Sequence, residues 1–143
     1  MDIRVIDNIE ILVPIYIAAF NGEPWNEKWT IESATKALKE IRTGPRFYGL
    51  AFFDKGEPIG AILGNIRTYD ASQVYYIDHL FVSPDHRRQG AASKLYQNAI
   101  EDLKEKGVKG AFFTTIRNSP AYGFYIKHGA IDVPNGSVMY HPF

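Results

Sequence analysis

A strand-like apolar segment, a short polar loop and the small residues of a helix start follow one another in residues 80–95, Leu80-Phe81-Val82-Ser83-Pro84-Asp85-His86-Arg87-Arg88-Gln89-Gly90-Ala91-Ala92-Ser93-Lys94-Leu95. Backbone N–H groups at a helix N-terminus lack intrahelical acceptors, and the helix dipole favours an anion beside them. Gly90, Ala91 and Ala92 carry no side chain that would keep a phosphate away from that backbone. Arg87 and Arg88 add charge of the sign that a phosphate needs. This stretch therefore predicts a pyrophosphate-binding loop.

The two common nucleotide-binding loops do not account for this stretch. A Walker loop needs Gly-x-x-x-x-Gly-Lys followed by Ser or Thr, and a dinucleotide fingerprint needs Gly-x-Gly-x-x-Gly. Neither pattern occurs in the chain. Taken alone, a strand–loop–helix with small residues and arginines is equally consistent with a structural role.

Outward from this stretch, apolar spacing and turn residues predict the order of elements of a mixed α/β fold. Strands are expected at residues 3–6, at 47–53, 59–69 and 74–82 as an antiparallel meander, at 110–116, and at 130–133 and 137–142 around a turn at 134–136. Helices are expected at residues 9–20, 30–43, 90–106 and 119–128, with Thr30 and Ser119 as caps and Gly107 at a helix end. Gly60 and Gly64 predict a bulge or a close backbone approach.

Length and composition favour one domain over residues 1–143. A chain of 143 residues with 45% hydrophobic side chains can bury a core without a disulfide or metal. Its 16 basic and 16 acidic side chains cancel, which argues against a protein that coats nucleic acid. The lack of cysteine excludes a disulfide framework, a thiolate zinc site and a cysteine nucleophile. The four histidines are scattered, so no metal site is expected.

The N-terminal residues carry no recognisable targeting signal, because they lack a basic flank followed by an apolar run. The most apolar early stretch, residues 9–20, is shorter than the about 20 residues that span a membrane, and it contains Pro14. We therefore expect a cytoplasmic protein with no membrane partner.

Two sequence blocks together point to a family. Residues 87–92, Arg-Arg-Gln-Gly-Ala-Ala, resemble the Arg/Gln-x-x-Gly-x-Gly/Ala signature of the GNAT superfamily of acyl-CoA-dependent N-acetyltransferases, and Leu80-x-Val82-x-Pro84 resembles the strand that precedes it. Residues 118–130, from Asn118 through Phe124-Tyr125-Ile126-Lys127 to Ala130, resemble the second block of that family. Ala92 replaces a glycine that many members have, which the signature tolerates, and Ala130 replaces a usual aromatic residue, which concerns packing.

The resemblance implies a central mixed, mostly antiparallel sheet with helices on both faces and a splayed pair of parallel strands near residues 74–82 and 110–116. Acetyl-CoA would lie in the gap between them, with its pantetheine along the strand before the loop and its pyrophosphate on residues 87–93. The residues that the resemblance assigns to acetyl-CoA are Leu80, Phe81, Val82, Arg87, Arg88, Gln89, Gly90, Ala91, Ala92, Ser93, Asn118 and Tyr122.

Tyr125 and Asp78 are the predicted catalytic residues. The resemblance places the family's acid at Tyr125, and a phenol with a pKa near 10 can donate a proton to a thiolate whose thiol has a pKa of about 8.5. The alternative for Tyr125 is a packed tyrosine with a satisfied hydroxyl. Asp78, two residues before Leu80 on the same strand face, could take the proton of the attacking amine. An aspartate paired with Lys or Arg is an equal alternative, and His79 is expected to be a packed residue.

The acceptor pocket is expected in the loop between the first two helices. Trp25, Glu27 and Trp29 in that loop, together with Tyr69, combine aromatic faces and a carboxylate that suit a cationic amine. The alternative is that the tryptophans close the core beneath a long loop.

These residues predict an acetyl-CoA-dependent N-acetyltransferase that acts on a primary amine of a small molecule or peptide. Without cysteine, direct transfer in a ternary complex is expected. The alternatives are a non-catalytic acyl-CoA-binding module on the same fold and a phosphate contact of RNA with residues 86–88. We expect no nucleic-acid partner and no metal, and homodimer formation is left open.

Overall fold

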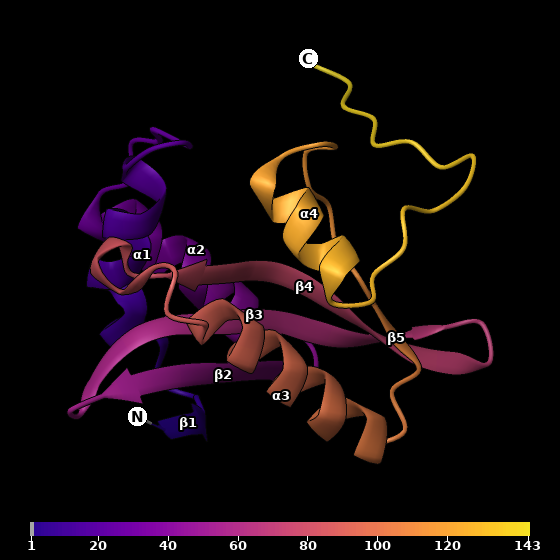
Figure 1. The fold of residues 1–143 in the computed structure, drawn as a ribbon, viewed down its shortest axis with the longest axis horizontal. Coiled ribbons are helices and arrows are strands. Elements are labelled where there is room, and N and C mark those ends of the chain that lie inside the picture. Colours follow the sequence, from indigo (N-terminus) through magenta and orange to yellow (C-terminus); the bar gives the residue numbers. More distant parts are fainter. Residues whose placement is uncertain (1) are drawn as a thin grey trace. The chain divides into compact units, whose positions relative to one another are not determined.

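The computed structural model describes residues 2–143, which form two compact units, one ending at Phe112 and one comprising Phe113–Phe143 (Figure 1). That the two act as one domain stays a prediction.

The first unit is built on a five-stranded sheet with helices on both faces. In chain order its elements are β1 (Asp2–Val5), the 3₁₀ helix η1 (Ile9–Leu12), α1 (Val13–Asn21), α2 (Ile31–Thr43), β2 (Phe47–Asp54), β3 (Glu57–Tyr69), β4 (Ser72–Val82), the 3₁₀ helix η2 (Pro84–His86), α3 (Ala91–Glu105) and β5 (Gly110–Phe112). The strands lie in the order β1-β2-β3-β4-β5, in which only β4 and β5 run parallel. This confirms the predicted mixed, mostly antiparallel sheet.

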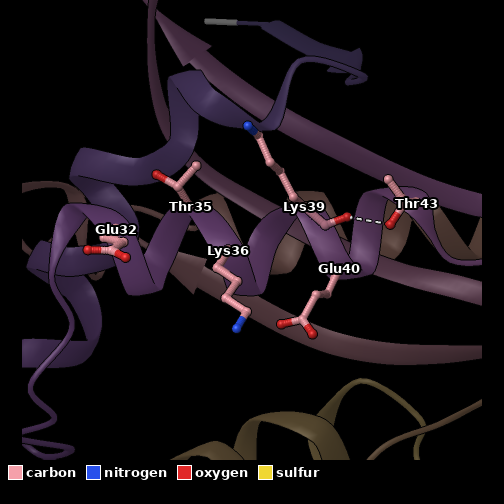
Figure 2. A pocket seen from close by; sticks show the side chains of 6 residues that line it. All are labelled: Glu32, Thr35, Lys36, Lys39, Glu40 and Thr43. Atoms are coloured by element: carbon pink, nitrogen blue, oxygen red, sulfur yellow. Dashed lines mark hydrogen bonds between the residues drawn. The ribbon is translucent and has the colours of Figure 1, made fainter.

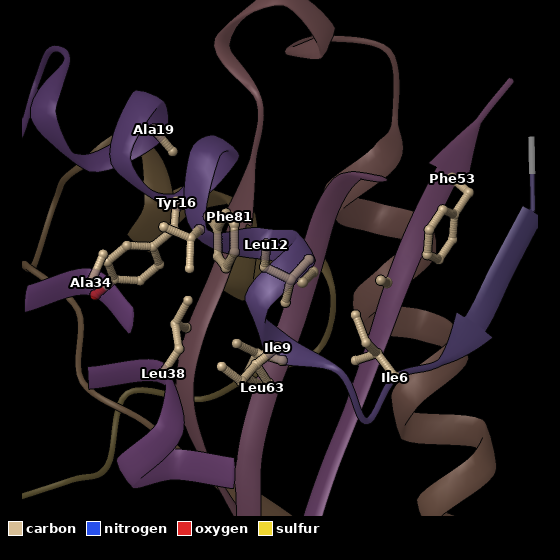
Figure 3. Packing of buried hydrophobic residues seen from close by; sticks show 13 residues of the cluster. Ile6, Ile9, Leu12, Tyr16, Ala19, Ala34, Leu38, Phe53, Leu63 and Phe81 are labelled. Atoms are coloured by element: carbon tan, nitrogen blue, oxygen red, sulfur yellow. The ribbon is translucent and has the colours of Figure 1, made fainter. Parts of the chain in front are cut away.

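Both faces of the sheet are covered. The consecutive residues Ala61, Ile62 and Leu63 of β3 point to alternating faces, and all are at most 1% exposed. On one face, α1 and α2 enclose a cluster that includes Leu12, Tyr16, Leu38, Leu63 and Phe81 (Figure 3). On the other face, α3 packs on β2, β3 and β4 (Figure 1).

A tyrosine hydrogen bond links the C-terminal part of α3 to the sheet, and a second one joins two strands beneath it. Tyr48 of β2 donates to Asp102 Oδ2 of α3 at 2.7 Å, and Tyr75 of β4 donates to the backbone oxygen of Tyr48 at 2.7 Å. The rings of Tyr48 and Tyr75 meet edge to face at 5.4 Å. The C-terminal part of α3 is thereby tied to β2, and the start of β4 is tied to the same strand.

The predicted caps are confirmed. Thr30 and Ser33 form a reciprocal capping box at the start of α2, with Ser33 N donating to Thr30 Oγ1 at 3.0 Å. Ser119 accepts from Tyr122 N at 3.1 Å, before Pro120 in the first turn of α4 (Pro120–Lys127). Gly107, with φ +84°, follows the end of α3 in the left-handed conformation expected there.

Gly64 lies where β3 and β4 approach closely, as its position in the sequence predicted. A Cβ atom at Gly64 would lie 2.0 Å from Tyr76 O. The strand register changes at the same place, because Leu63 pairs with His79 whereas Gly64 pairs with Ile77. Asp78 is therefore an extra residue on β4 and forms a β-bulge.

Three predicted strand assignments were wrong. The strand expected at 110–116 ends at Phe112, because its pairing with β4 covers only Val74–Tyr76. The strands expected at 130–133 and 137–142 do not form, although the turn between them does, with Gly136 N donating to Val133 O at 3.2 Å. Residues 131–143 are all exposed. A segment of alternating apolar residues forms a strand only where an adjacent strand supplies hydrogen bonds and a packing surface covers its apolar side chains.

Candidate active site

The N-terminus of α3 presents free backbone donors. Gly90, the N-cap, has φ +79°, and Arg88 has φ +63°, so both adopt left-handed conformations that turn the loop sharply. No side chain caps this helix. Within residues 2–143, the backbone N–H groups of residues 87–93 make no hydrogen bond to the protein. Such a run of unpaired donors at a positive helix end is suited to bind an anion with several oxygens.

The edge of β4 that leads to this loop is open on one side. Parallel pairing with β5 ends at Tyr76 and Phe112, so the part of β4 from Ile77 to Val82 pairs with β3 alone within the described residues. Leu80 is half-buried, and Phe81 and Val82 are buried. An extended ligand can hydrogen-bond to the backbone of such an unpaired edge.

Asp78 is the bulge residue of β4. The prediction that its side chain lies on the same strand face as Leu80 assumed regular alternation of side chains, and a bulge interrupts that alternation. The Asp78 side chain is in contact with solvent. Partial burial nevertheless raises the pKa of its carboxyl group, and the guanidinium of Arg67 opposes that shift. The carboxylate at the bulge can serve as a proton acceptor.

His79, the residue after the bulge, packs among the aromatic rings of α1. Its Nε2 atom lies 3.3 Å from the hydroxyl of Tyr16, and its ring lies 5.1 Å from the Tyr16 ring and 5.4 Å from the Phe20 ring. Burial lowers the pKa of His79 to about 4, so the imidazole is neutral at pH 7. This is the packed histidine that the sequence indicated.

The loop between α1 and α2 is tied to the core at Trp29. Asn21 donates from Nδ2 to Trp29 O and accepts from Trp29 N, both at 2.8 Å, and the Trp29 ring meets Tyr16 at 5.1 Å. Trp29 Nε1 donates to Glu27 Oε1 at 2.9 Å. Trp25 remains 47% exposed and packs on Phe20 at 5.3 Å. Trp29 thus closes the core, while Trp25 and Glu27 are accessible from outside.

Tyr69 lies apart from these loop residues. It pairs with Ser72 at the hairpin that joins β3 and β4, eight residues along β3 from Ala61, which pairs with Phe81. Eight residues of strand span roughly 25 Å. Tyr69 packs there on Phe112 at 5.9 Å, and Arg67 lies over the Tyr76 ring at 4.5 Å. The structure does not bring Tyr69 and the tryptophan loop together.

The two arginines of the α3 loop differ in their contacts. The guanidinium of Arg87 donates to the backbone oxygens of Ala19 and Glu23 near the end of α1. Arg88 is exposed, and among residues 2–143 its side chain makes no hydrogen bond, ion pair or stacking contact. The sequence indicated the charge of both but not this difference, because the partners of Arg87 lie 64 and 68 residues earlier in the chain.

In the second unit, α4 carries Tyr122 and Tyr125. Tyr125 is half-buried, and its ring lies 4.2 Å from that of Phe113. Tyr122 donates to Asp132 Oδ2 at 3.1 Å, and Arg117 donates to both oxygens of Asp132 at 2.8 and 3.1 Å. Asn118 is exposed with φ +65°. The sequence did not predict this network of Arg117, Tyr122 and Asp132, since only the fold brings the three side chains together.

An open hollow of about 530 Å³ lies along the outer stripe of α2 (Figure 2). Its lining residues are Glu32, Thr35, Lys36, Lys39, Glu40 and Thr43. They recur at three- and four-residue intervals on one helix and carry both signs of charge, as an exposed helix face does. None is a candidate site residue.

Among residues 2–143, no three His, Asp or Glu side chains gather closely enough to hold a metal ion. In the same part of the chain, no helix combines the length and the apolar character needed to cross a membrane.

Residues 9–130 match the sequence model of the acetyltransferase (GNAT) family. A curated relative is the catalytic subunit NAA20 of the N-terminal acetyltransferase B complex from Arabidopsis thaliana, 32% identical over 90 residues. That match covers 61% of this chain and 51% of the relative, so this chain matches about half the length of the relative.

Solved structures with the same fold include a transcriptional regulator from Bacillus halodurans C-125, with a TM-score of 0.78 and 22% identity over 98% of this chain and 100% of the other. They also include the aminoglycoside N-acetyltransferase AAC(6')-Iy in complex with CoA, with a TM-score of 0.76 and 20% identity over 99% of this chain and 93% of the other. At such identities these likenesses establish the fold alone.

Proposed function

This chain belongs to the acetyltransferase (GNAT) family, and we propose that it transfers an acetyl group from acetyl-CoA to a primary amine of a small molecule or peptide. The observation that carries the proposal is the run of unpaired backbone N–H groups at residues 87–93, directly after the open edge of β4. A pyrophosphate offers the several acceptor oxygens that this run of donors needs. The N-terminal acetyltransferase and aminoglycoside acetyltransferase among the compared proteins support an amine acceptor.

The residues present fit acetyl-CoA, which supplies an acyl carbon and a thiolate leaving group when bound. Gly90, Ala91 and Ala92 let the pyrophosphate approach the helix end, and Arg88 contributes positive charge. The backbone of Leu80 to Val82 aligns the pantetheine as an additional extended segment. Asn118, Gln89 and Ser93 are proposed as further contacts.

The reaction moves one proton from nitrogen to sulfur in net terms. The amine nitrogen attacks the thioester carbon, the carbon–sulfur bond breaks, and an amide and a thiol result. Asp78 accepts the proton that the nitrogen loses, directly or through water, and Tyr125 donates a proton to the departing sulfur. With no cysteine in the chain to carry the acyl group, the amine attacks directly.

The loop between α1 and α2 (residues 22–29), called the acceptor loop, is proposed to bind the amine as a cation. This cation releases one proton to solvent to give the free amine that attacks, and the second proton leaves the nitrogen during the transfer itself. Trp25 offers an exposed ring and Glu27 a carboxylate, which together suit an ammonium group. The aromatic cluster of Tyr69 lies at the far end of β3, where it could contact only a long acceptor. A cytoplasmic location stays a prediction.

The test is a thiol-release assay with acetyl-CoA over a panel of amines, polyamines, aminoglycosides and peptides with free N-termini. Because the chain has no cysteine, the thiol reagent does not react with the enzyme itself. We expect amine-dependent release of CoA for at least one class. Tight CoA binding with no release over the whole panel would favour the non-catalytic acyl-CoA-binding module instead.

Asp78→Asn should abolish the acid limb of the pH profile of kcat. A base works deprotonated, so wild-type activity rises as pH passes the raised pKa of Asp78, whereas the amide cannot titrate. Turnover should fall by about 100-fold. The matched control is Asp70→Asn at the β3–β4 turn, where φ is +54° and asparagine is equally tolerated. An unchanged acid limb in Asp78→Asn would remove Asp78 from proton transfer.

Tyr125→Phe should lower kcat by about 10- to 100-fold and leave the KM of acetyl-CoA within about threefold of wild type. The phenyl ring keeps the contact with Phe113 but has no proton to give. Tyr140→Phe, at an exposed tail position of the same unit, is the control. Steady-state kinetics with unaltered kcat in Tyr125→Phe would exclude the tyrosine as the acid.

A further inference from the structure

Arg87 joins the loop at the start of α3 to the end of α1. Its Nη1 donates to Glu23 O and its Nη2 to Ala19 O, each at 3.3 Å. Its Cζ also lies 5.7 Å from the centre of the Trp25 ring. One side chain from the proposed cofactor loop thus holds the backbone on both sides of Gly22 and contacts the most exposed aromatic residue of the acceptor loop.

The end of α1 is suited to this contact. Its last carbonyl oxygens have no intrahelical donor and form the negative end of the helix dipole. Phe20 O accepts from Glu27 N and Gly22 O from Asn26 N, both at 2.9 Å, so the loop itself satisfies some of these groups. Arg87 satisfies Ala19 O. A planar guanidinium can bond to separate carbonyls and lie near an aromatic ring at once, which an ammonium cannot.

We propose that Arg87 is a positioning residue that couples occupancy of the α3 N-terminus to the order of residues 22–29. The proposal rests on the proposed function, because it takes CoA as the ligand of the α3 N-terminus. An anion bound to residues 87–93 restrains the backbone of Arg87, and Arg87 then restrains Glu23 and Trp25. By linkage, an ordered acceptor loop strengthens CoA binding by the same factor.

Arg87 and Arg88 therefore have different roles. Arg88 is exposed and serves as a charge near the phosphates, whereas the guanidinium of Arg87 acts through the acceptor loop. Amine affinity should therefore depend on whether acetyl-CoA is bound first.

The experiment measures opening of the loop by endoprotease Lys-C, which cuts after lysine. Lys28 lies in the acceptor loop and is exposed, and Lys55 in the turn between β2 and β3 serves as an internal reference. Nicking at each lysine is followed by mass spectrometry with and without CoA, and the CoA affinity of each variant is measured by calorimetry.

Without ligand, Arg87→Ala should be nicked after Lys28 about tenfold faster than wild type, because two hydrogen bonds to the loop are lost. Arg88→Ala should stay within about twofold of wild type at Lys28, and Lys55 should be unaffected in both. Saturating CoA should protect Lys28 in wild type and in Arg88→Ala but not in Arg87→Ala. Arg87→Lys, which keeps the charge on one nitrogen, should recover only part of the protection.

Equal nicking of Arg87→Ala and wild type, or full protection of Arg87→Ala by CoA, would overturn the proposal. Full recovery in Arg87→Lys would assign the effect to charge alone and would also overturn it. CoA that binds without protecting Lys28 in wild type would overturn the coupling while leaving the proposed function intact. Calorimetry with no CoA binding in any variant would overturn the proposed function itself.

Discussion

Replacing Ala92 by Asp should raise the KM of acetyl-CoA by about 100-fold or more while the protein becomes no less stable. Ala92 is the second residue of α3, where the backbone N–H groups have no protein acceptor. A carboxylate there would accept from those groups and complement the helix dipole, which stabilises a helix by about 0.3 to 1 kcal/mol. The same carboxylate occupies the donors that the pyrophosphate needs and repels it.

The opposite signs of the two effects make the prediction specific. Unit charges 4 Å apart interact by about 4 kcal/mol at an effective dielectric constant of 20, which exceeds the energy of a 100-fold change in affinity. Ala92→Asn is the matched control, since it has the same shape without the charge and should raise KM far less. Steady-state kinetics and thermal melting measure both quantities. A KM in Ala92→Asp close to that of Ala92→Asn would place the pyrophosphate elsewhere.

Gly64→Ala should destabilise the protein by about 3 kcal/mol or more, which lowers Tm by about 10 °C. The new Cβ atom would lie 2.0 Å from Tyr76 O and 2.9 Å from Tyr76 C. Both are backbone atoms in a paired strand, so they cannot move aside as a flexible side chain would. Relief of the clash requires β3 and β4 to separate beside the Asp78 bulge, and activity should fall together with stability.

Gly110→Ala is the control for this change, because it also adds a methyl group to a glycine of the sheet. No heavy atom lies within 4 Å of a Cβ atom built at Gly110. Its effect should stay within about 0.5 kcal/mol in chemical denaturation. Equal stabilities of the two variants would mean that β3 and β4 do not approach at Gly64 as described.

Features decided by neighbouring residues were predictable from the sequence. The capping side chains of Thr30 and Ser119 each accept a hydrogen bond from the backbone three residues later. Gly107 is required by the left-handed backbone conformation at its own position. The stretch at residues 80–95 combined a strand end, small residues and a helix start, and the structure has the same order there. Gly64 indicated a close approach because a glycine inside a strand has few other uses.

Features that depend on distant residues were not predictable. Residues 130–142 alternate as strands do, but no neighbouring strand pairs with them, so the pattern was misleading. The bulge residue could not be identified, since it depends on the register of β4 against β3. Arg87 and Arg88 are chemically identical, and only the position of the α1 end distinguishes them.

Acetyl transfer from acetyl-CoA to an amine can be followed by mass spectrometry of the products formed from acetyl-CoA with a deuterated acetyl group. The enzyme is incubated with the amine class that releases most thiol in the panel, and CoA and modified amine are quantified over time. We predict an amine that gains one deuterated acetyl group for each CoA released, with no acetylated enzyme when the amine is omitted. CoA release with no acetylated amine, or an acetylated enzyme that precedes the product, would contradict direct transfer to the amine.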